Sequence, residues 1–142
     1  MKDIRFIDIM KKKILRIVDA NINRATEGLR VVEEILRFVY KDERIYKNLR
    51  IIRHNIVKLF QNLYPDTVFQ RDSSIDPGRS AKEKKYKKIN EIIISNFHRT
   101  TESFRVLEEI AKLILPNVVS EVKKLRYEVY DLEKYVIKKF LK

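Results

Sequence analysis

The sequence predicts an all-α fold: four long helices arranged as two repeated helical hairpins with internal pseudo-twofold symmetry. Its 142 residues include only two glycines and three prolines, so few positions can interrupt a long helix. Apolar residues recur at helical spacing, and no stretch shows the alternation that is typical of strands. Residues 21–35 recur as residues 96–110, with nine of the fifteen positions identical. A repeat at this distance indicates two copies of one structural unit.

The first hairpin is expected over about residues 14–64. Its first helix covers about Lys12 to Tyr40, and residues 1–10 form either a short leading helix or the first turns of this one. Asp42 is the candidate N-cap of the second helix, which Tyr64 and Pro65 end. The apolar residues that should face the core are Ile14, Val18, Ala25, Leu29, Val32, Leu36 and Val39, then Ile45, Leu49, Ile52, Ile56, Leu59 and Leu63.

Residues 65–80 form the long irregular stretch of the chain and contain Pro77 and Gly78. A loop of this length in a compact domain is usually functional or disordered. Its mixture of charged, hydroxyl and apolar residues favours an ordered functional loop, and the disordered alternative stays open. The loop therefore joins the two hairpins of one domain that covers residues 1–142.

Helical periodicity returns from about Ala81 to Leu115, and Pro116 ends it. The apolar stripe of the last helix aligns with that of the second helix at a constant offset of 73 residues. The second copy of the hairpin is therefore expected over about residues 89–139. The stripe of its last helix consists of Val118, Val122, Leu125, Val129, Leu132 and Val136.

The composition excludes several kinds of chemistry. The absence of cysteine excludes disulfides, thiol catalysis and thiolate zinc sites, and two histidines argue against a histidine metal site. No apolar run reaches membrane-spanning length, and charges occupy the N-terminal positions where a signal peptide would be apolar. We therefore expect a cytoplasmic protein with no membrane partner. The bias towards lysine, glutamate and isoleucine is typical of a thermophile.

The net charge of +12 favours anionic partners such as phosphates or nucleotides. The structural alternative is a solvated lysine-rich surface. Much of the excess charge lies in residues 11–13, 82–88 and 138–142, which we expect to be helix faces and a tail.

The repeat preserves polar residues as well as apolar ones, which a repeat kept for packing alone would not need. On the first helix, Asn21, Arg24 and Gly28 follow one flank of the apolar stripe, and Asn96, Arg99 and Ser103 do so in the second copy. We interpret the two sets as halves of one polar site. Asn21 and Asn96 could instead be core amides that bond within the protein.

Glu27, Arg30 and Glu34 lie on the adjoining polar face of the first helix. Their structural alternative is a set of intrahelical ion pairs, each worth about 0.2–0.5 kcal/mol. Gly28 in mid-helix costs about 1 kcal/mol relative to alanine, so a partner helix or a ligand must approach closely there.

Phosphate binding would have to rely on side chains, because the chain lacks the glycine-rich loops that hold phosphates through backbone N–H groups. Arginine grips phosphate through two parallel hydrogen bonds and is therefore the expected ligand. Any metal would be Mg²⁺ held by one or two carboxylates together with phosphate oxygens and water.

Residues 18–34 resemble the opening motif of the small hydroxymethylpyrimidine-phosphate kinases, which occur alone or fused in front of thiamine-phosphate synthase. The resemblance extends over about residues 15–139. The other matching elements are Ile52-Arg53-His54, Arg71-Asp72-Ser73 with Asp76 and Gly78, Asn96 and Arg99, residues 105–109, and Leu125-Arg126-Tyr127. The chain departs from the pattern at Ser73, where threonine is usual, at Pro77, and at His98, where lysine is common.

The resemblance implies an ATP-dependent phosphotransferase that converts hydroxymethylpyrimidine phosphate to the diphosphate, with Mg²⁺. The acceptor phosphate is already ionised near neutral pH, so no general base is required. The implied catalytic phosphate binders are Arg24, Arg30, Arg71, Arg99 and Arg105. The implied substrate-binding residues are Asn21, Glu27, Asn96, Glu102, Arg53, Arg126, Ser73 and Gly78. The implied metal ligands are Asp72, Asp76 and Glu34.

Two other classes of function remain as alternatives. A basic helical nucleic-acid binder would use the exposed lysines and arginines, although the glutamates of the repeat would repel a phosphate backbone and argue against it. A non-catalytic helical bundle would use the repeat for packing only. A homodimer is compatible with the kinase, and the sequence leaves open which half binds ATP.

Overall fold

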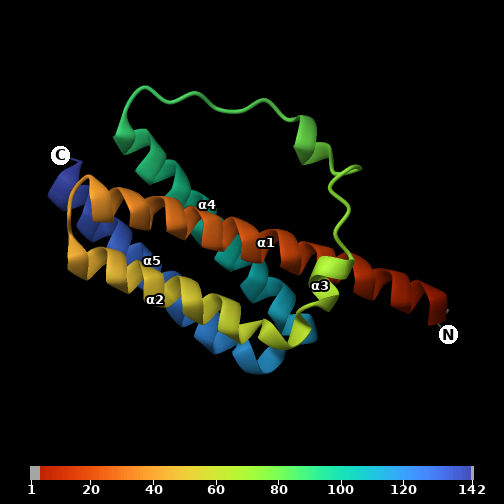
Figure 1. The fold of residues 1–142 in the computed structure, drawn as a ribbon. Helices are drawn as coiled ribbons and strands as arrows, with labels where there is room; N and C mark the ends of the chain where they lie inside the picture. Colours follow the sequence, from red (N-terminus) through yellow and green to blue (C-terminus); the bar gives the residue numbers. More distant parts are fainter. Residues whose placement is uncertain (1–3, 142) are drawn as a thin grey trace.

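The computed structural model describes residues 4–141 and confirms the all-α prediction, since it contains no strand in this range. Its long helices are α1 (Ile4–Phe38), α2 (Glu43–Leu59), α4 (Ile89–Ile114) and α5 (Val119–Phe140). Helices α1 and α2 form one antiparallel hairpin and α4 and α5 form another (Figure 1). The short helices are η1 (Gln61–Leu63), α3 (Asp66–Phe69), η2 (Pro77–Ser80) and η3 (Pro116–Val118).

Helix α1 continues without a break from Ile4, so residues 4–10 are its first turns rather than a separate helix. Residues 1–3 lie outside the described part of the chain. The predicted stripe of α1 is buried from Val18 to Leu36, whereas Val39 is exposed because the helix ends at Phe38. No helix in the described residues is long and apolar enough to cross a membrane.

The turn between α1 and α2 follows from two residues. Lys41 adopts a φ of 55°, in the left-handed region that ends helices. Asp42 then caps α2, as predicted, since its Oδ1 accepts a hydrogen bond from the backbone N–H of Ile45 at 3.1 Å. Its other oxygen accepts from Lys139 Nζ at 2.9 Å and so ties the turn to α5.

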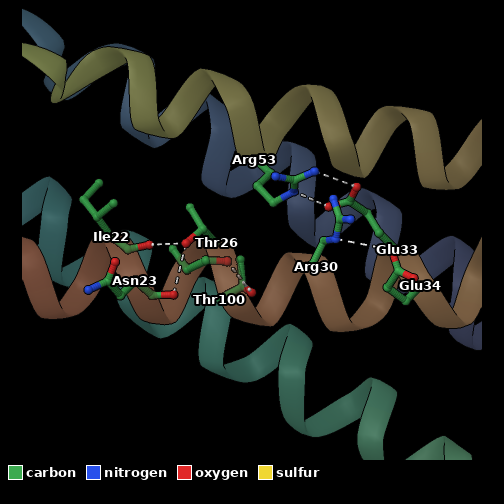
Figure 2. Close-up of polar contacts among 9 residues, drawn as sticks. Ile22, Asn23, Thr26, Arg30, Glu33, Glu34, Arg53 and Thr100 are labelled. Carbon is green, nitrogen blue, oxygen red and sulfur yellow. Dashed lines mark hydrogen bonds and ion pairs between the residues drawn. The ribbon is translucent and has the colours of Figure 1, made fainter.

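Gly28 lies where α1 crosses α4, and the close approach there is that of the partner helix. A Cβ at Gly28 would lie 2.5 Å from Thr100 Oγ1 and 2.9 Å from the backbone oxygen of Asn96. Thr100 reaches α1 at this point and donates a hydrogen bond to the carbonyl of Ala25 at 3.4 Å (Figure 2). The glycine therefore sets how closely the two hairpins pack.

The methyl group of Gly28→Ala is expected to cost about 1–3 kcal/mol in packing, because Thr100 and the α4 backbone must shift to admit it. A gain of about 1 kcal/mol in helix propensity offsets part of this cost, so the expected net loss of stability is up to about 2 kcal/mol. Denaturant unfolding measures the net effect. The matched control is Gly78→Ala in η2, where the methyl group would meet only the Asp76 carboxylate at 3.2 Å. A Gly28→Ala variant as stable as wild type would show that Thr100 and the α4 backbone can move aside at no net cost in stability.

The structure corrects the start of the third long helix, α4. It begins at Ile89, not near Ala81, so the lysines of residues 82–88 lie on a loop rather than on a helix face. All residues of 81–88 are exposed, so this segment buries no apolar stripe that could hold a helix. The segment 65–80, expected to be irregular, contains α3 and η2. From α3 the chain passes along α1 to the start of α4 (Figure 1).

Candidate functional site

Two adjoining clefts follow α1. The first, the α1–loop cleft, has a volume of about 560 Å³ and lies between α1 and residues 71–76. The second, the α1–α4 cleft, has a volume of about 810 Å³ and is bordered by α1, α4 and residues 84–86. Asn21 and Arg24 line both clefts. These two residues therefore form a shared wall, and a group at Arg24 can be reached from either side.

The α1–loop cleft takes its cations from one face of α1, because residues three or four apart lie above one another on a helix. The lining residues are Lys13, Arg16, Ile17, Asp19, Ala20, Asn21, Asn23 and Arg24 from α1, and Arg71, Asp72, Ser73 and Asp76 from the loop. Lys13 and Arg16 were not among the candidates from the sequence. Lys13 and Arg16 lie eleven and eight residues before Arg24, which is about three and two helical turns. This spacing is the sequence signal that could have placed them on the same face as Arg24.

Arg71 anchors the loop to α1. Its Nη2 and Nε donate to the two carboxylate oxygens of Asp19 at 2.7 and 2.8 Å. Asp19 is nearly buried, whereas the Arg71 side chain is 46% exposed. The hydrogen bonds to Asp19 raise the pKa of Arg71, so this cation is retained at any physiological pH. The paired arginine fixes the loop and still presents part of its guanidinium to the cleft.

The loop brings Asp72, Ser73 and Asp76 into the α1–loop cleft together. Ser74 Oγ donates to Asp72 at 2.6 Å and holds the pKa of that carboxyl below its usual value, so Asp72 is ionised at neutral pH. Asp76 accepts from the N–H of Gly78 at 2.9 Å. No group of three or more metal-binding side chains occurs in the described residues. Two loop carboxylates fit a Mg²⁺ ion that takes its other ligands from phosphate and water.

The α1–α4 cleft joins the two copies of the repeat. Asn21 and Asn96 each donate a side-chain hydrogen bond to their own helix, to Ile17 and Ile92 at 2.8 Å, which leaves each amide oxygen and one N–H for a ligand. Arg99 lies 3.4 Å from Glu27 across the helix crossing. The lining residues from the second half of the chain are Lys84, Tyr86, Glu91, Ile94, Ser95, Asn96, His98, Arg99, Glu102, Ser103 and Val106.

Three of the candidate residues, Arg30, Glu34 and Arg105, lie in ion pairs along their own helix and line neither cleft. Arg30 pairs with Glu34 at 3.2 Å along α1, on the polar side of the helix (Figure 2). Arg105 contacts Glu108 and Glu109 at 2.6 and 3.0 Å along α4. Gly78 lies in η2 outside the residues that line either cleft. The polar face of each repeat therefore divides between cleft residues and intrahelical pairs.

Arg53 and Arg126 lie inside the hairpins. Arg53 bridges α2 to the buried carboxylate of Glu33 on α1 through two hydrogen bonds (Figure 2). Arg126 on α5 lies 3.1 Å from the buried Glu108 on α4. Both arginines thus join the helices of their own hairpin, a structural role that the apolar periodicity alone did not reveal. Glu33 and Glu108, identical positions of the repeat, are the acids that the sequence analysis missed.

A family model described as the ThiD2 family matches residues 16–135. Similar curated proteins are the thiamine-phosphate synthases of Nostoc punctiforme (35% identical, covering 87% of this chain and 35% of that protein) and Synechocystis (37% identical, covering 84% and 35%). The chain spans about a third of the length of these relatives. No solved structure matches it.

Proposed function

The chain belongs to the ThiD2 family, and we propose that it acts in thiamine biosynthesis as a kinase that forms hydroxymethylpyrimidine diphosphate. The substrates are hydroxymethylpyrimidine phosphate and ATP. The proposal concerns the third of the matched thiamine-phosphate synthases that this chain spans.

The observation that carries this proposal is the wall of Asn21 and Arg24 between two cation-lined clefts. A kinase whose acceptor is itself a phosphate must hold two anionic groups in contact. Each phosphorylated molecule needs cations of its own. The phosphoryl group that is transferred needs a further cation between the two molecules. One cleft for each phosphorylated molecule, with Arg24 common to both, meets this requirement.

In the proposed reaction an oxygen of the acceptor phosphate attacks the γ-phosphorus of ATP. The bond to the β–γ bridging oxygen breaks, and ADP leaves with its electron pair. The acceptor oxygen is ionised, so the chain supplies position and charge rather than a base. Arg24 contacts the transferring phosphoryl group, Arg16 and Arg71 hold the acceptor phosphate, and Arg99 holds the nucleotide phosphates.

Glu27 lies against Arg99 and restrains its guanidinium. Asp72 and Asp76 are the residues that would hold Mg²⁺, which would supply further charge neutralisation to the phosphoryl groups that meet at Arg24. Asn21 and Asn96 offer amide groups to the bound molecules.

The test is ADP release by the purified protein with ATP, Mg²⁺ and hydroxymethylpyrimidine phosphate. Unphosphorylated hydroxymethylpyrimidine and a sample without acceptor are measured alongside. We expect turnover that depends on the phosphorylated acceptor, because the α1–loop cleft supplies cations for its phosphate. A folded sample, verified by its helical circular dichroism, that releases no ADP with either acceptor would contradict the proposal.

A further inference from the structure

A third cavity opens beside the α1–loop cleft and differs from it in chemistry. This apolar slot has a volume of about 390 Å³ and lies between α1, α2 and the segment from η1 to α3. Its apolar and aromatic walls are Val18, Ile22, Val57, Phe60, Tyr64 and Val68. A cavity of this size with aromatic walls and a few polar groups is typical of a site for a small flat ligand.

The slot and the α1–loop cleft are continuous. Asp19, Asn23 and Arg71 line both of them. The bidentate pair of Arg71 and Asp19 therefore stands at the boundary between an apolar space and a cationic one. A molecule with an aromatic ring and a phosphate on a short linker could place the ring on one side of Arg71 and the phosphate on the other.

The polar groups of the slot match the edge of a heterocycle. The Thr26 hydroxyl donates its proton towards the backbone oxygens of Ile22 and Asn23, which lie 2.9 and 3.1 Å from its Oγ1. Figure 2 draws both contacts. Because its one proton is used in this way, the hydroxyl presents only acceptor lone pairs to the slot. An exocyclic amine on the ring could donate to it. Asn23 and Gln61 add amide groups that can both donate and accept.

The slot belongs to the first hairpin and is not a general property of the repeat. The position of Ile22 corresponds to Phe97 in the second copy, and that of Val57 corresponds to Tyr130. Both counterparts are bulkier, and Phe97 is fully buried in the core. The two hairpins thus differ where a ring would have to enter.

We propose that the apolar slot binds the aminopyrimidine ring of the phosphorylated acceptor, with the acceptor phosphate beside Arg71 in the α1–loop cleft. This inference rests on the proposed function and assigns its two substrates. The nucleotide then occupies the larger α1–α4 cleft, where Lys84, Tyr86 and Arg99 lie. The transferring phosphoryl group passes between the clefts at Arg24.

A fluorescence titration tests the slot without requiring turnover. The chain contains no tryptophan, so Tyr64→Trp places a single tryptophan on the slot. The matched control is Tyr127→Trp, an exposed position on α5 outside the slot. Hydroxymethylpyrimidine phosphate should change the fluorescence of Tyr64→Trp saturably and leave that of Tyr127→Trp unchanged. Binding of this compound, measured by calorimetry, with no response from Tyr64→Trp would overturn the inference.

A kinetic test separates the slot from the kinase itself. Val57→Tyr brings the second hairpin's residue into the first, at a position 43% exposed, so the core is undisturbed. We expect the KM for the pyrimidine phosphate to rise about tenfold or more and the KM for ATP to stay within about twofold. Ile51→Tyr, exposed on α2 and outside the slot, is the control and should change neither.

The two failures are distinguishable. Unchanged kinetics in Val57→Tyr, with an active wild type, would overturn the ring site and leave the kinase in place. An inactive wild type would overturn the kinase, while the fluorescence titration would still decide whether the slot binds the pyrimidine.

Discussion

Replacing Arg24 with alanine is expected to lower kinase turnover more than a hundredfold with the fold intact. Arg24 is an exposed arginine of α1 and lines both clefts, so its guanidinium can contact the phosphoryl group during transfer. Charge stabilisation of this kind is worth about 3–4 kcal/mol in the transition state. The measurement is kcat for ADP release, together with the melting temperature of each variant.

The matched control for Arg24 is Arg50→Ala, which removes an exposed arginine from α2, a helix that lines neither cleft. Its turnover should equal that of wild type, which would exclude an effect of net charge. Arg24→Lys keeps the charge and loses the forked geometry, so its turnover should lie between those of wild type and Arg24→Ala. Near-normal turnover of Arg24→Ala would remove this residue from the site.

Replacing Glu108 with alanine is expected to destabilise the protein by about 3–5 kcal/mol. The Glu108 side chain is 3% exposed and lies 3.1 Å from Arg126, whose side chain is 12% exposed. Without the carboxylate, Arg126 keeps a buried charge with no compensating partner, and its buried Nε already has no hydrogen-bond partner. Denaturant unfolding monitored by circular dichroism gives the change in the free energy of unfolding.

The neighbouring Glu109→Ala is the control for Glu108. Glu109 also contacts Arg105 and pairs with Lys112 at 2.6 Å, but its side chain is 49% exposed. Solvent screens such pairs, so the expected loss is about 0–1 kcal/mol. Replacing both partners, as Glu108→Leu with Arg126→Met, should recover most of the stability, because the remaining charge is then gone. Equal losses in Glu108→Ala and Glu109→Ala would contradict the importance of burial.

The sequence by itself determined the helical elements. The periodicity of apolar residues predicted the long helices, and Asp42 was identified as the cap of α2 from its position before the second stripe. These features are local, since a helix needs only its own backbone hydrogen bonds and one apolar face. Residues 81–88 were wrongly predicted to be helical, because the spacing of residues alone does not show whether a partner surface receives their side chains. The pseudo-twofold symmetry stays a prediction.

The candidate site was only half determined by the sequence. The repeat singled out Asn21, Arg24, Asn96 and Arg99, and the structure gathers all four around the α1–α4 cleft. The same repeat gave equal weight to Arg30 and Arg105, which lie in intrahelical pairs instead. Identity between the two copies of the repeat shows that the same residue type occupies both positions. It does not show whether that residue binds a ligand or forms an ion pair.

Tertiary structure decided the rest, because the decisive neighbours are far apart in the chain. Asp19 meets Arg71 across fifty-two residues, and Glu33 meets Arg53 across a hairpin. The crossing at Gly28 fixes which faces of α1 and α4 open into clefts and which are buried against another helix. Burial then determines the role of each charge, since an enclosed carboxylate must be paired while an exposed arginine is available to bind phosphate.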